Sequence, residues 1–180
     1  MPIYNAPLAD MQFILNDVFN ASAFWQQHPK LAHLDSATAN AILEEMAKFS
    51  QNVTLPLNRS GDEHGAQFNA STVTTPEGFK AAFEQYAQGG WLGLGADEEW
   101  GGQGMPKMLT VLSDEMLFAT NPSFTLYSLL SVGAGLALAS YASQQQKQTY
   151  LPKMYSGEWA GTMCLTEPHA GTDLGIIKTK

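Results

Sequence analysis

The feature that most restricts the fold of this chain is a long stretch without charge. No aspartate, glutamate, lysine or arginine occurs between Glu115 and Lys147, and the segment from Ser123 to Ser143 is long enough to cross a bilayer. Serine and threonine recur through this segment, and neither an aromatic belt nor a basic flank follows it. We therefore expect a helix that opens at Asn121 and runs buried through the middle of a soluble helical fold, and we expect no membrane span.

Helical periodicity also precedes this segment. Met11, Leu15 and Val18 share one face of a helix that we expect from about Ala9 to Asn20. Apolar spacing, capping residues and proline or glycine stops predict further helices. Their expected ranges are 21–27, 35–56, 75–89, a helix that begins at 106, and 143–152.

Two stretches break the helical pattern. Residues 58–75 are rich in glycine and small polar side chains, which predicts a loop with a short hairpin around 67–73. Residues 159–166, WAGTMCLT, lie between Gly157 and Pro168 and have no helical period, which predicts a β-strand over roughly 160–166. The fold class that follows is mainly α, with a helical domain over residues 1–157 and the first strand and loop of a β domain over 158–180.

Composition excludes several classes of function. Acidic residues outnumber basic ones 17 to 9, the formal net charge is -8, and Arg59 is the only arginine, so no basic surface is available for a nucleic acid. Cys164 is the only cysteine, which excludes an internal disulfide and fits a reducing compartment. The N-terminus has no basic segment followed by an apolar run. We expect a cytoplasmic protein that does not bind nucleic acid.

Familiar metal and nucleotide motifs are not found. The four histidines are widely spaced and have no cysteine cluster beside them, so we expect no metal site. Gly133 and Gly135 begin a G-x-G pattern, but Leu138 takes the place of the third glycine and the context is helical. The GGQG turn at 101–104 lacks the lysine and hydroxyl residue of a phosphate-binding loop.

The strongest functional signal is the string CLTEPHAGTD at 164–173. Pro168 forces Glu167 into an extended conformation, after which the chain turns abruptly. Gly171 leaves room for the close approach of a flat ligand, and Thr166 and Thr172 place hydroxyls on either side of the turn. Because such turn residues are also common without a ligand, the full string carries more weight than its parts.

The full string resembles the signature of the acyl-CoA dehydrogenase family, in which Thr or Ser, Glu, two variable residues, a small residue, Gly, Ser or Thr, and Asp follow one another. Three further stretches resemble the same family in the same order: PLNRSGDEHG at 56–65, GGWLGLGADEEWGGQGMP at 89–106 and QQKQTYLPKMYSGEWAGTMCLTEP at 145–168. The resemblance covers essentially the whole chain, as the N-terminal part of such an enzyme. The opening MPIYNAPLADMQFIL looks most similar to the bacterial branch that includes 3-(methylthio)propanoyl-CoA dehydrogenase.

This resemblance implies a site for FAD and a site for an acyl-CoA substrate. The residues that it assigns to FAD are Met163, Leu165, Thr166, Gly171 and Thr172, and Thr172 would also touch the pantetheine arm of the substrate. On the long uncharged helix, the residues that it assigns to the acyl pocket are Leu126, Leu129, Leu130 and Gly133. The sequence departs from the commonest family pattern at His169 and Ile176, and neither departure removes a ligand-bearing position.

The implied reaction is the α,β-dehydrogenation of an acyl-CoA thioester, in which a carboxylate base takes the α-proton and a hydride leaves the β-carbon for flavin. The resemblance places that base in a C-terminal domain, and none of the 180 residues matches it. We therefore expect no catalytic residue and no activity in this fragment. The implied partners are an electron-transfer flavoprotein or similar acceptor, and further copies of the chain when it is full length. The alternative function is that of a non-catalytic helical protein-interaction domain.

Overall fold

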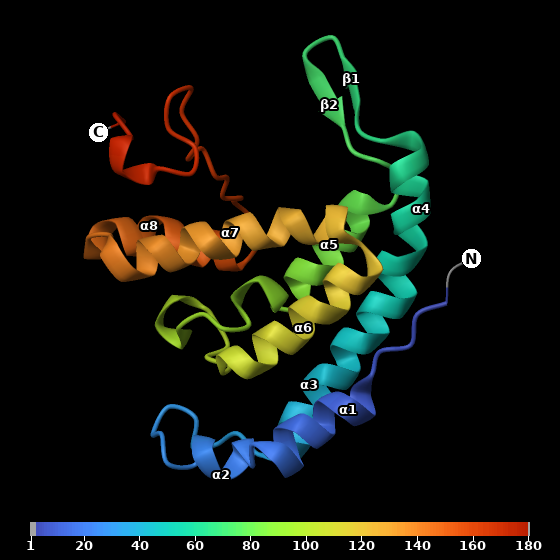
Figure 1. Cartoon of the computed structure of the whole chain (residues 1–180), viewed down its shortest axis with the longest axis vertical. Helices are drawn as coiled ribbons and strands as arrows, with labels where there is room; N and C mark the ends of the chain where they lie inside the picture. The colour runs from blue at the N-terminus through green and yellow to red at the C-terminus, as the bar shows by residue number, and fades with distance from the viewer. Residues whose placement is uncertain (1–2, 180) are drawn as a thin grey trace.

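The computed structural model describes residues 3–179 and is mainly α-helical (Figure 1). The α-helices are α1 (Leu8–Phe13), α2 (Ala21–Trp25), α3 (Ser36–Phe49), α4 (Leu55–His64), α5 (Phe79–Gln88), α6 (Lys107–Thr120), α7 (Pro122–Tyr141) and α8 (Gln144–Tyr155). Wider π-helical turns are η1 (Ile14–Val18) and η2 (Ser50–Thr54), and 3-10 turns are η3 (Trp91–Gly93), η4 (Glu98–Trp100) and η5 (Leu174–Ile176). The expected fold class is confirmed.

The hydrophobic core lies where α3, α5, α6 and α7 meet. Met46 of α3 and Met116 of α6 have no exposed surface. Three aromatic rings pack together beside them, with centroids 5.5 Å apart for Phe49 and Tyr86 and 5.9 Å apart for Tyr86 and Phe124. Burial of large apolar side chains such as these is the main stabilising contribution to a helical fold.

A small buried polar cluster joins the end of η2 to α6 and α7. The Asn121 side chain donates to the carbonyl oxygen of Thr54 over 3.1 Å and accepts from the backbone N–H of Phe124 over 3.0 Å. The hydroxyls of Thr54 and Thr120 lie 2.7 Å apart. All three polar side chains are fully buried. Asn121 is thus the N-cap of α7, as its position before Pro122 predicts, and also links three helices.

The two predicted proline stops are wrong. We expected the third helix to end near Pro56, but the chain remains helical through η2 and α4 as far as His64. Pro56 lies in the first turn of α4, directly after the wide turn η2, where a missing backbone N–H costs little. Pro152 likewise lies inside α8, which ends at Tyr155. Gly157, with φ of 80°, then reverses the chain direction.

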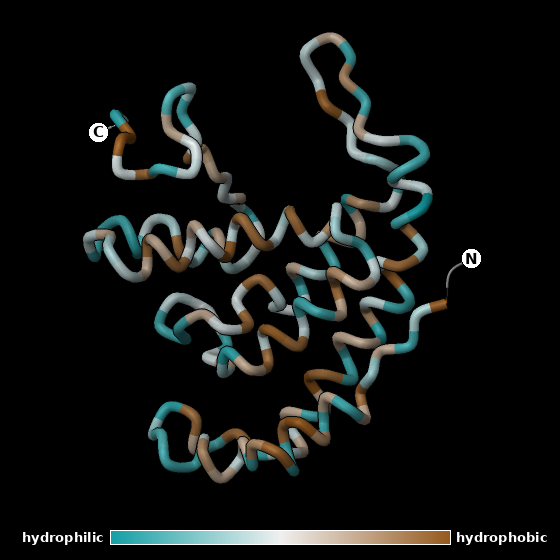
Figure 2. Tube along the Cα trace, in the orientation of Figure 1, coloured by the Kyte–Doolittle hydropathy of each residue, from teal (hydrophilic) through white to brown (hydrophobic). Residues whose placement is uncertain are grey.

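Helix α7 does not run buried through the middle of the fold. Its buried side chains are mostly small and polar, namely Phe124, Thr125, Ser128, Ser131 and Gly135. Its large apolar side chains Leu126, Leu129, Val132 and Leu136 are partly exposed, and the last three also line a cavity beside the helix. Hydrophobic residues follow the helix along its length (Figure 2). α7 is long and apolar enough to cross a membrane by length and composition, and 28% of its most apolar window is buried. The expectation of burial all round is therefore wrong.

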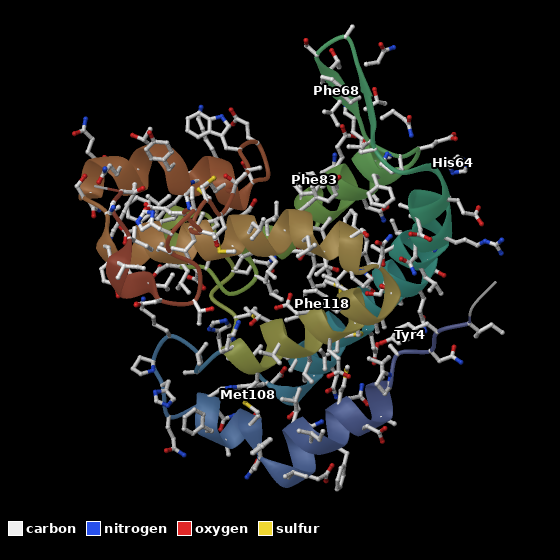
Figure 3. The ribbon with its side chains drawn as sticks, turned by 45° about the horizontal axis from the view of Figure 1, so that its top comes forward. Tyr4, His64, Phe68, Phe83, Met108 and Phe118 are labelled. Carbon is white, nitrogen blue, oxygen red and sulfur yellow. The ribbon has the colours of Figure 1, made fainter. Side chains whose placement is uncertain are left out.

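The expected hairpin is confirmed, although the loop around it is shorter than predicted. β1 (Gln67–Asn69) pairs antiparallel with β2 (Thr72–Thr74), whereas residues 58–64 belong to α4. The hairpin projects beyond the helices and carries Phe68 outward (Figure 3). The next helix begins at Phe79 rather than at Pro76, and it ends before Gly89 as expected.

The strand predicted over residues 160–166 is not formed. These residues have no regular secondary structure, and the bridge between Glu167 and Ala170 only closes a turn beyond them. A strand needs a hydrogen-bonded neighbour, and the hairpin, which is the only other β-structure among residues 3–179, does not pair with it. The division of the chain into two domains near residue 157 stays a prediction.

Candidate functional site

The segment expected to face a flavin begins where the chain leaves α8 and passes over α7 (Figure 1). The backbone N–H of Trp159 donates to the carbonyl oxygen of Lys153 over 3.0 Å. The ammonium group of Lys153 lies 4.3 Å from the centre of the Trp159 ring, and the Tyr150 ring lies 5.6 Å from it. These contacts fix the base of the segment on α8.

Beyond this base, the backbone of residues 162–166 makes no hydrogen bond to any other part of the chain within residues 3–179. The side chains of Met163, Leu165 and Thr166 are exposed. An exposed stretch of unpaired N–H and C=O groups is available to a neighbouring strand or to a polar ring such as a flavin. The structure thus leaves these three predicted site residues accessible.

The turn that follows is closed by the carboxylate of Glu167. It accepts hydrogen bonds from the backbone N–H of Lys178 over 3.0 Å and of Thr179 over 2.9 Å, and from the Thr179 hydroxyl. The Thr179 hydroxyl and these backbone donors hold the pKa of the Glu167 carboxyl below its usual value. His169 Nε2 lies 3.3 Å from a Glu167 oxygen and 3.3 Å from the carbonyl oxygen of Ile176. The two residues that depart from the family pattern therefore lie together in this turn.

Gly171 and Thr172 lie at the tip of this turn and are exposed. Within residues 3–179, no atom outside its immediate neighbours would come within 4 Å of a Cβ at Gly171. This surface is open enough for the close approach of a ligand. All five predicted FAD residues are exposed, and the fold encloses none of them.

The four predicted acyl-pocket residues lie on α7 and differ in their surroundings. Leu126 and Gly133 are exposed, Leu129 is 39% exposed, and Leu130 is half-buried. Of these four, only Leu129 lines a cavity, which it shares with Ser128, Val132 and Leu136 of the same helix. The structure therefore groups Leu129 with residues that the sequence did not single out.

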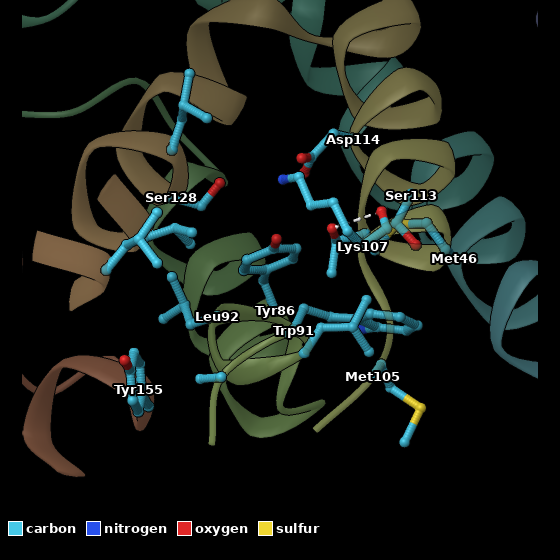
Figure 4. Close-up of a pocket in the computed structure, with 17 residues that line it drawn as sticks. Met46, Tyr86, Trp91, Leu92, Met105, Lys107, Ser113, Asp114, Ser128 and Tyr155 are labelled. Atoms are coloured by element: carbon cyan, nitrogen blue, oxygen red, sulfur yellow. Dashed lines mark hydrogen bonds between the residues drawn. The ribbon is translucent and has the colours of Figure 1, made fainter. Parts of the chain in front are cut away.

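This cavity lies between α5, α6 and α7 and has a volume of about 210 Å³ (Figure 4). Most of its lining is apolar, but Tyr86, Lys107, Ser113, Asp114 and Ser128 add polar groups. No functional role was predicted from the sequence for Tyr86 or Asp114. For Asp114, the available signal was a carboxylate within the apolar stretch of α6, between Leu112 and Met116.

Burial shapes the electrostatics of the cavity. Burial raises the pKa of the Asp114 carboxyl, and the charge of Lys107 offsets part of this shift. Burial also raises the pKa of the Tyr86 hydroxyl, against a smaller opposite effect from its hydrogen bond with Ser128. Tyr86 is therefore a neutral hydrogen-bonding group at neutral pH. The buried Ser113 hydroxyl has no hydrogen-bond partner among the described residues.

Within residues 3–179, no group of three or more His, Cys, Asp or Glu side chains is arranged to hold a metal ion. The charged and polar groups that the fold does assemble are the exposed turn at 167–179 and the cavity beside α7.

The solved structures that share this fold include two acyl-CoA dehydrogenases. An acyl-CoA dehydrogenase from Bacillus anthracis, complexed with FAD, superposes with a TM-score of 0.64 and 26% identity over 79% of this chain and 23% of its own. Butyryl-CoA dehydrogenase from Megasphaera elsdenii gives a TM-score of 0.63 and 21% identity over 76% of this chain and 34% of its own. The second likeness shows the fold alone.

The sequence comparisons agree. The family model "Acyl-CoA dehydrogenase, N-terminal domain" matches residues 36–158, and the chain belongs to the acyl-CoA dehydrogenase family. It is 36% identical to 3-methylmercaptopropionyl-CoA dehydrogenase of Ruegeria pomeroyi over 97% of this chain, and 36% identical to a butyryl-CoA dehydrogenase of Syntrophomonas wolfei over 78%. The matches span 30% and 23% of those relatives. The resemblance found in the sequence is confirmed.

Proposed function

We propose that this chain is the N-terminal portion of an FAD-dependent acyl-CoA dehydrogenase that catalyses α,β-dehydrogenation of an acyl-CoA thioester. The observation that carries the proposal is the exposed segment with an unpaired backbone over residues 162–166, which leads into the open turn at Gly171 beside α7. Bound FAD would supply the hydride acceptor. The proposed electron acceptor is an electron-transfer flavoprotein or a similar protein, and the proposed location is the cytoplasm.

The residues present fit one wall of a flavin site. The backbone donors at residues 163–166 and the hydroxyls of Thr166 and Thr172 are accessible, and the bare backbone at Gly171 allows a ring to approach. Thr166 would hydrogen-bond the flavin ring, Leu165 would offer its backbone, and the stretch that contacts FAD would begin at Met163. Thr172 would also contact the pantetheine arm. These roles follow the family resemblance, and the accessibility of the residues supports them.

On the substrate side, Leu126, Leu129, Leu130 and Gly133 of α7 would exclude water from the acyl chain. α7 lies under the flavin-facing segment, since Gly161 packs directly on it. The acyl chain and the flavin would therefore meet above the same helix, α7. We propose that the exposed face of α7 is covered by the rest of the complete enzyme or by another copy in a homo-oligomer, and not by a membrane.

We further propose that these 180 residues alone neither retain FAD tightly nor oxidise acyl-CoA. The predicted FAD residues are exposed on one side of an open surface, and tight binding depends on pre-organised enclosure. The test is the visible absorption spectrum of the purified chain after FAD is added and the excess removed, followed by an assay with acyl-CoA and an artificial electron acceptor. Stoichiometric flavin with turnover would show that a carboxylate within this chain acts as the base.

The same proposal is tested in the full-length protein by Thr166→Val, which deletes a hydroxyl and keeps the β-branched shape. We expect FAD affinity to fall by about 0.5–1.5 kcal/mol if the lost hydrogen bond is to a neutral group. Thr162→Val is the matched control, because Thr162 lies outside the predicted FAD residues in the same exposed segment. A colourless full-length protein would favour the non-catalytic interaction domain instead.

A further inference from the structure

Where the flavin-facing segment crosses α7, one hydrogen bond joins the segment to the helix. The backbone N–H of Gly161 donates to the hydroxyl of Ser131 over 3.0 Å, and Ser131 is only 3% exposed. The same hydroxyl donates to the carbonyl oxygen of Tyr127, one turn earlier in α7, over 3.3 Å. Ser131 therefore uses its donor within the helix and its acceptor for the segment above it.

The two backbones are also unusually close at this point. A Cβ at Gly161 would lie 2.6 Å from the Cβ of Ala134 and 3.2 Å from the carbonyl oxygen of Leu130. Both of these contacts are to α7 residues that are next to Ser131 in the chain or about one turn from it, and a third contact, at 3.2 Å, is to the Met154 side chain of α8. The absence of a side chain at residue 161 is thus what lets the segment rest directly on the helix.

Residue 161 is the last point at which the segment is held before its exposed part. Trp159 is fixed on α8 by its hydrogen bond and ring contacts, and Gly161 is fixed on α7. From 162 to 166 no backbone hydrogen bond joins the segment to other residues within 3–179. The direction of the exposed residues is therefore set largely at Gly161.

We propose that Ser131 and Gly161 are positioning residues that set the height and direction of the flavin-facing segment above α7. Leu130, assigned to the acyl pocket, is the sequence neighbour of Ser131, and its carbonyl oxygen faces Gly161. One helix thereby holds both the acyl-lining side chains and the segment assigned to FAD. We call the contact of Gly161 with Ser131 and Ala134 the joint. The consequence for flavin rests on the proposed function, whereas the joint itself lies within these 180 residues.

A label on Cys164 tests the joint directly. Cys164 is the only cysteine in the chain and is exposed, three residues beyond Gly161. A nitroxide on Cys164 of the 180-residue chain should report greater mobility in Ser131→Ala, and the amide of Gly161 should exchange about threefold to tenfold faster, as expected for one lost hydrogen bond. Gly161→Ala should also increase mobility, because its methyl group would push the segment away from Ala134.

Ser140→Ala is the matched control. Ser140 lies on the same helix and its hydroxyl makes the same kind of bond, to the carbonyl oxygen of Leu136 over 2.8 Å, but it is exposed and has no bond to the segment. We expect an unchanged nitroxide spectrum in this variant. Unchanged nitroxide mobility and Gly161 exchange in Ser131→Ala, in a chain with a normal helical circular dichroism spectrum, would overturn the proposal.

The flavin consequence has its own readout. In the flavin-loaded full-length enzyme, Ser131→Ala should shift the visible flavin absorption bands, and Ser140→Ala should not. Identical bands in Ser131→Ala and the wild type would overturn the flavin part of the proposal. A full-length protein that binds no flavin would contradict the proposed function, and the nitroxide experiment would still decide whether Ser131 and Gly161 form the joint.

Discussion

At the scale of single residues, Asn121 makes the most consequential polar contacts in the fold. It caps α7 through Phe124 and satisfies the buried carbonyl of Thr54 on the neighbouring helical segment. We expect Asn121→Ala to lower the free energy of unfolding by about 2 kcal/mol, because it removes the cap of α7 and the buried hydrogen bond from Asn121 to Thr54. Urea unfolding measures this change.

Ser143→Ala provides the comparison, because Ser143 caps α8 at an exposed site with a reciprocal bond to Gln146. It should cost only about 1 kcal/mol. Equal losses in the Asn121 and Ser143 variants would mean that the bond from Asn121 to Thr54 contributes nothing to stability.

Asp114 makes stability depend on pH. Burial raises the pKa of its carboxyl in the folded protein above the ordinary value of 3.8, so the folded state binds more protons than the unfolded chain. Its contribution to stability therefore falls as the pH rises through this window, and the penalty is complete above the folded-state pKa. We expect Asp114→Asn to raise the urea midpoint at about pH 7 but not at about pH 3.

Asp17→Asn is a suitable control for this pH test because Asp17 is exposed on η1. The midpoint should change little at either pH in that variant. A gain of the same size at both pH values in Asp114→Asn would rule out the titration of Asp114 as its cause.

At the scale of elements, the turn that connects the two strands of the hairpin is strained. Ala70 and Ser71 have φ of 46° and 69°, a left-handed conformation that costs roughly 1–2 kcal/mol for each such residue. Ala70→Asn combined with Ser71→Gly supplies the residues that this turn favours. We expect the strand amides to exchange about tenfold more slowly. The global unfolding midpoint should stay the same, because both strands are exposed.

Ala70→Val should have the opposite effect on hairpin exchange, since a β-branched residue is least compatible with positive φ. Amide exchange by NMR distinguishes the two variants. If the Asn-Gly variant raised the global midpoint instead, the hairpin would be part of the cooperative core.

At the scale of the whole molecule, we expect the partly exposed apolar side chains of α7 to drive self-association. Leu126 is 51% exposed and Leu136 is 67% exposed, on a helix with no charge of its own. Exposed apolar patches of this kind promote association. We expect the isolated chain to self-associate in sedimentation velocity experiments, and we expect Leu126→Glu with Leu136→Glu to make it monomeric with little change in the unfolding midpoint.

Phe68→Glu on the hairpin is the control for this prediction. Phe68 is 75% exposed but lies on the projecting hairpin, not on α7. That variant should associate like the wild type. A wild-type chain that is monomeric at high concentration would show that the α7 face needs no cover.

Local sequence was sufficient for most helices and for the hairpin, because caps and turns act within a few residues. Asp35 and Ser143 begin α3 and α8 as predicted, since each side chain accepts from a backbone N–H three residues ahead. The two proline stops failed for reasons that residue spacing does not show. The wide turn η2 precedes Pro56, and packing of Leu151 and Met154 keeps α8 helical past Pro152.

The sequence by itself determined the mainly helical fold, the family and the position of the turn after Glu167, because these depend on residue spacing and on one specific string. Only the tertiary structure decided which face of α7 is buried. The Thr125 and Ser128 hydroxyls bond to carbonyl oxygens of their own helix, so a small polar face can be buried at little cost and pack closely, while the leucines point outward. The absence of a strand at 160–166 is tertiary as well, since a strand exists only beside a partner.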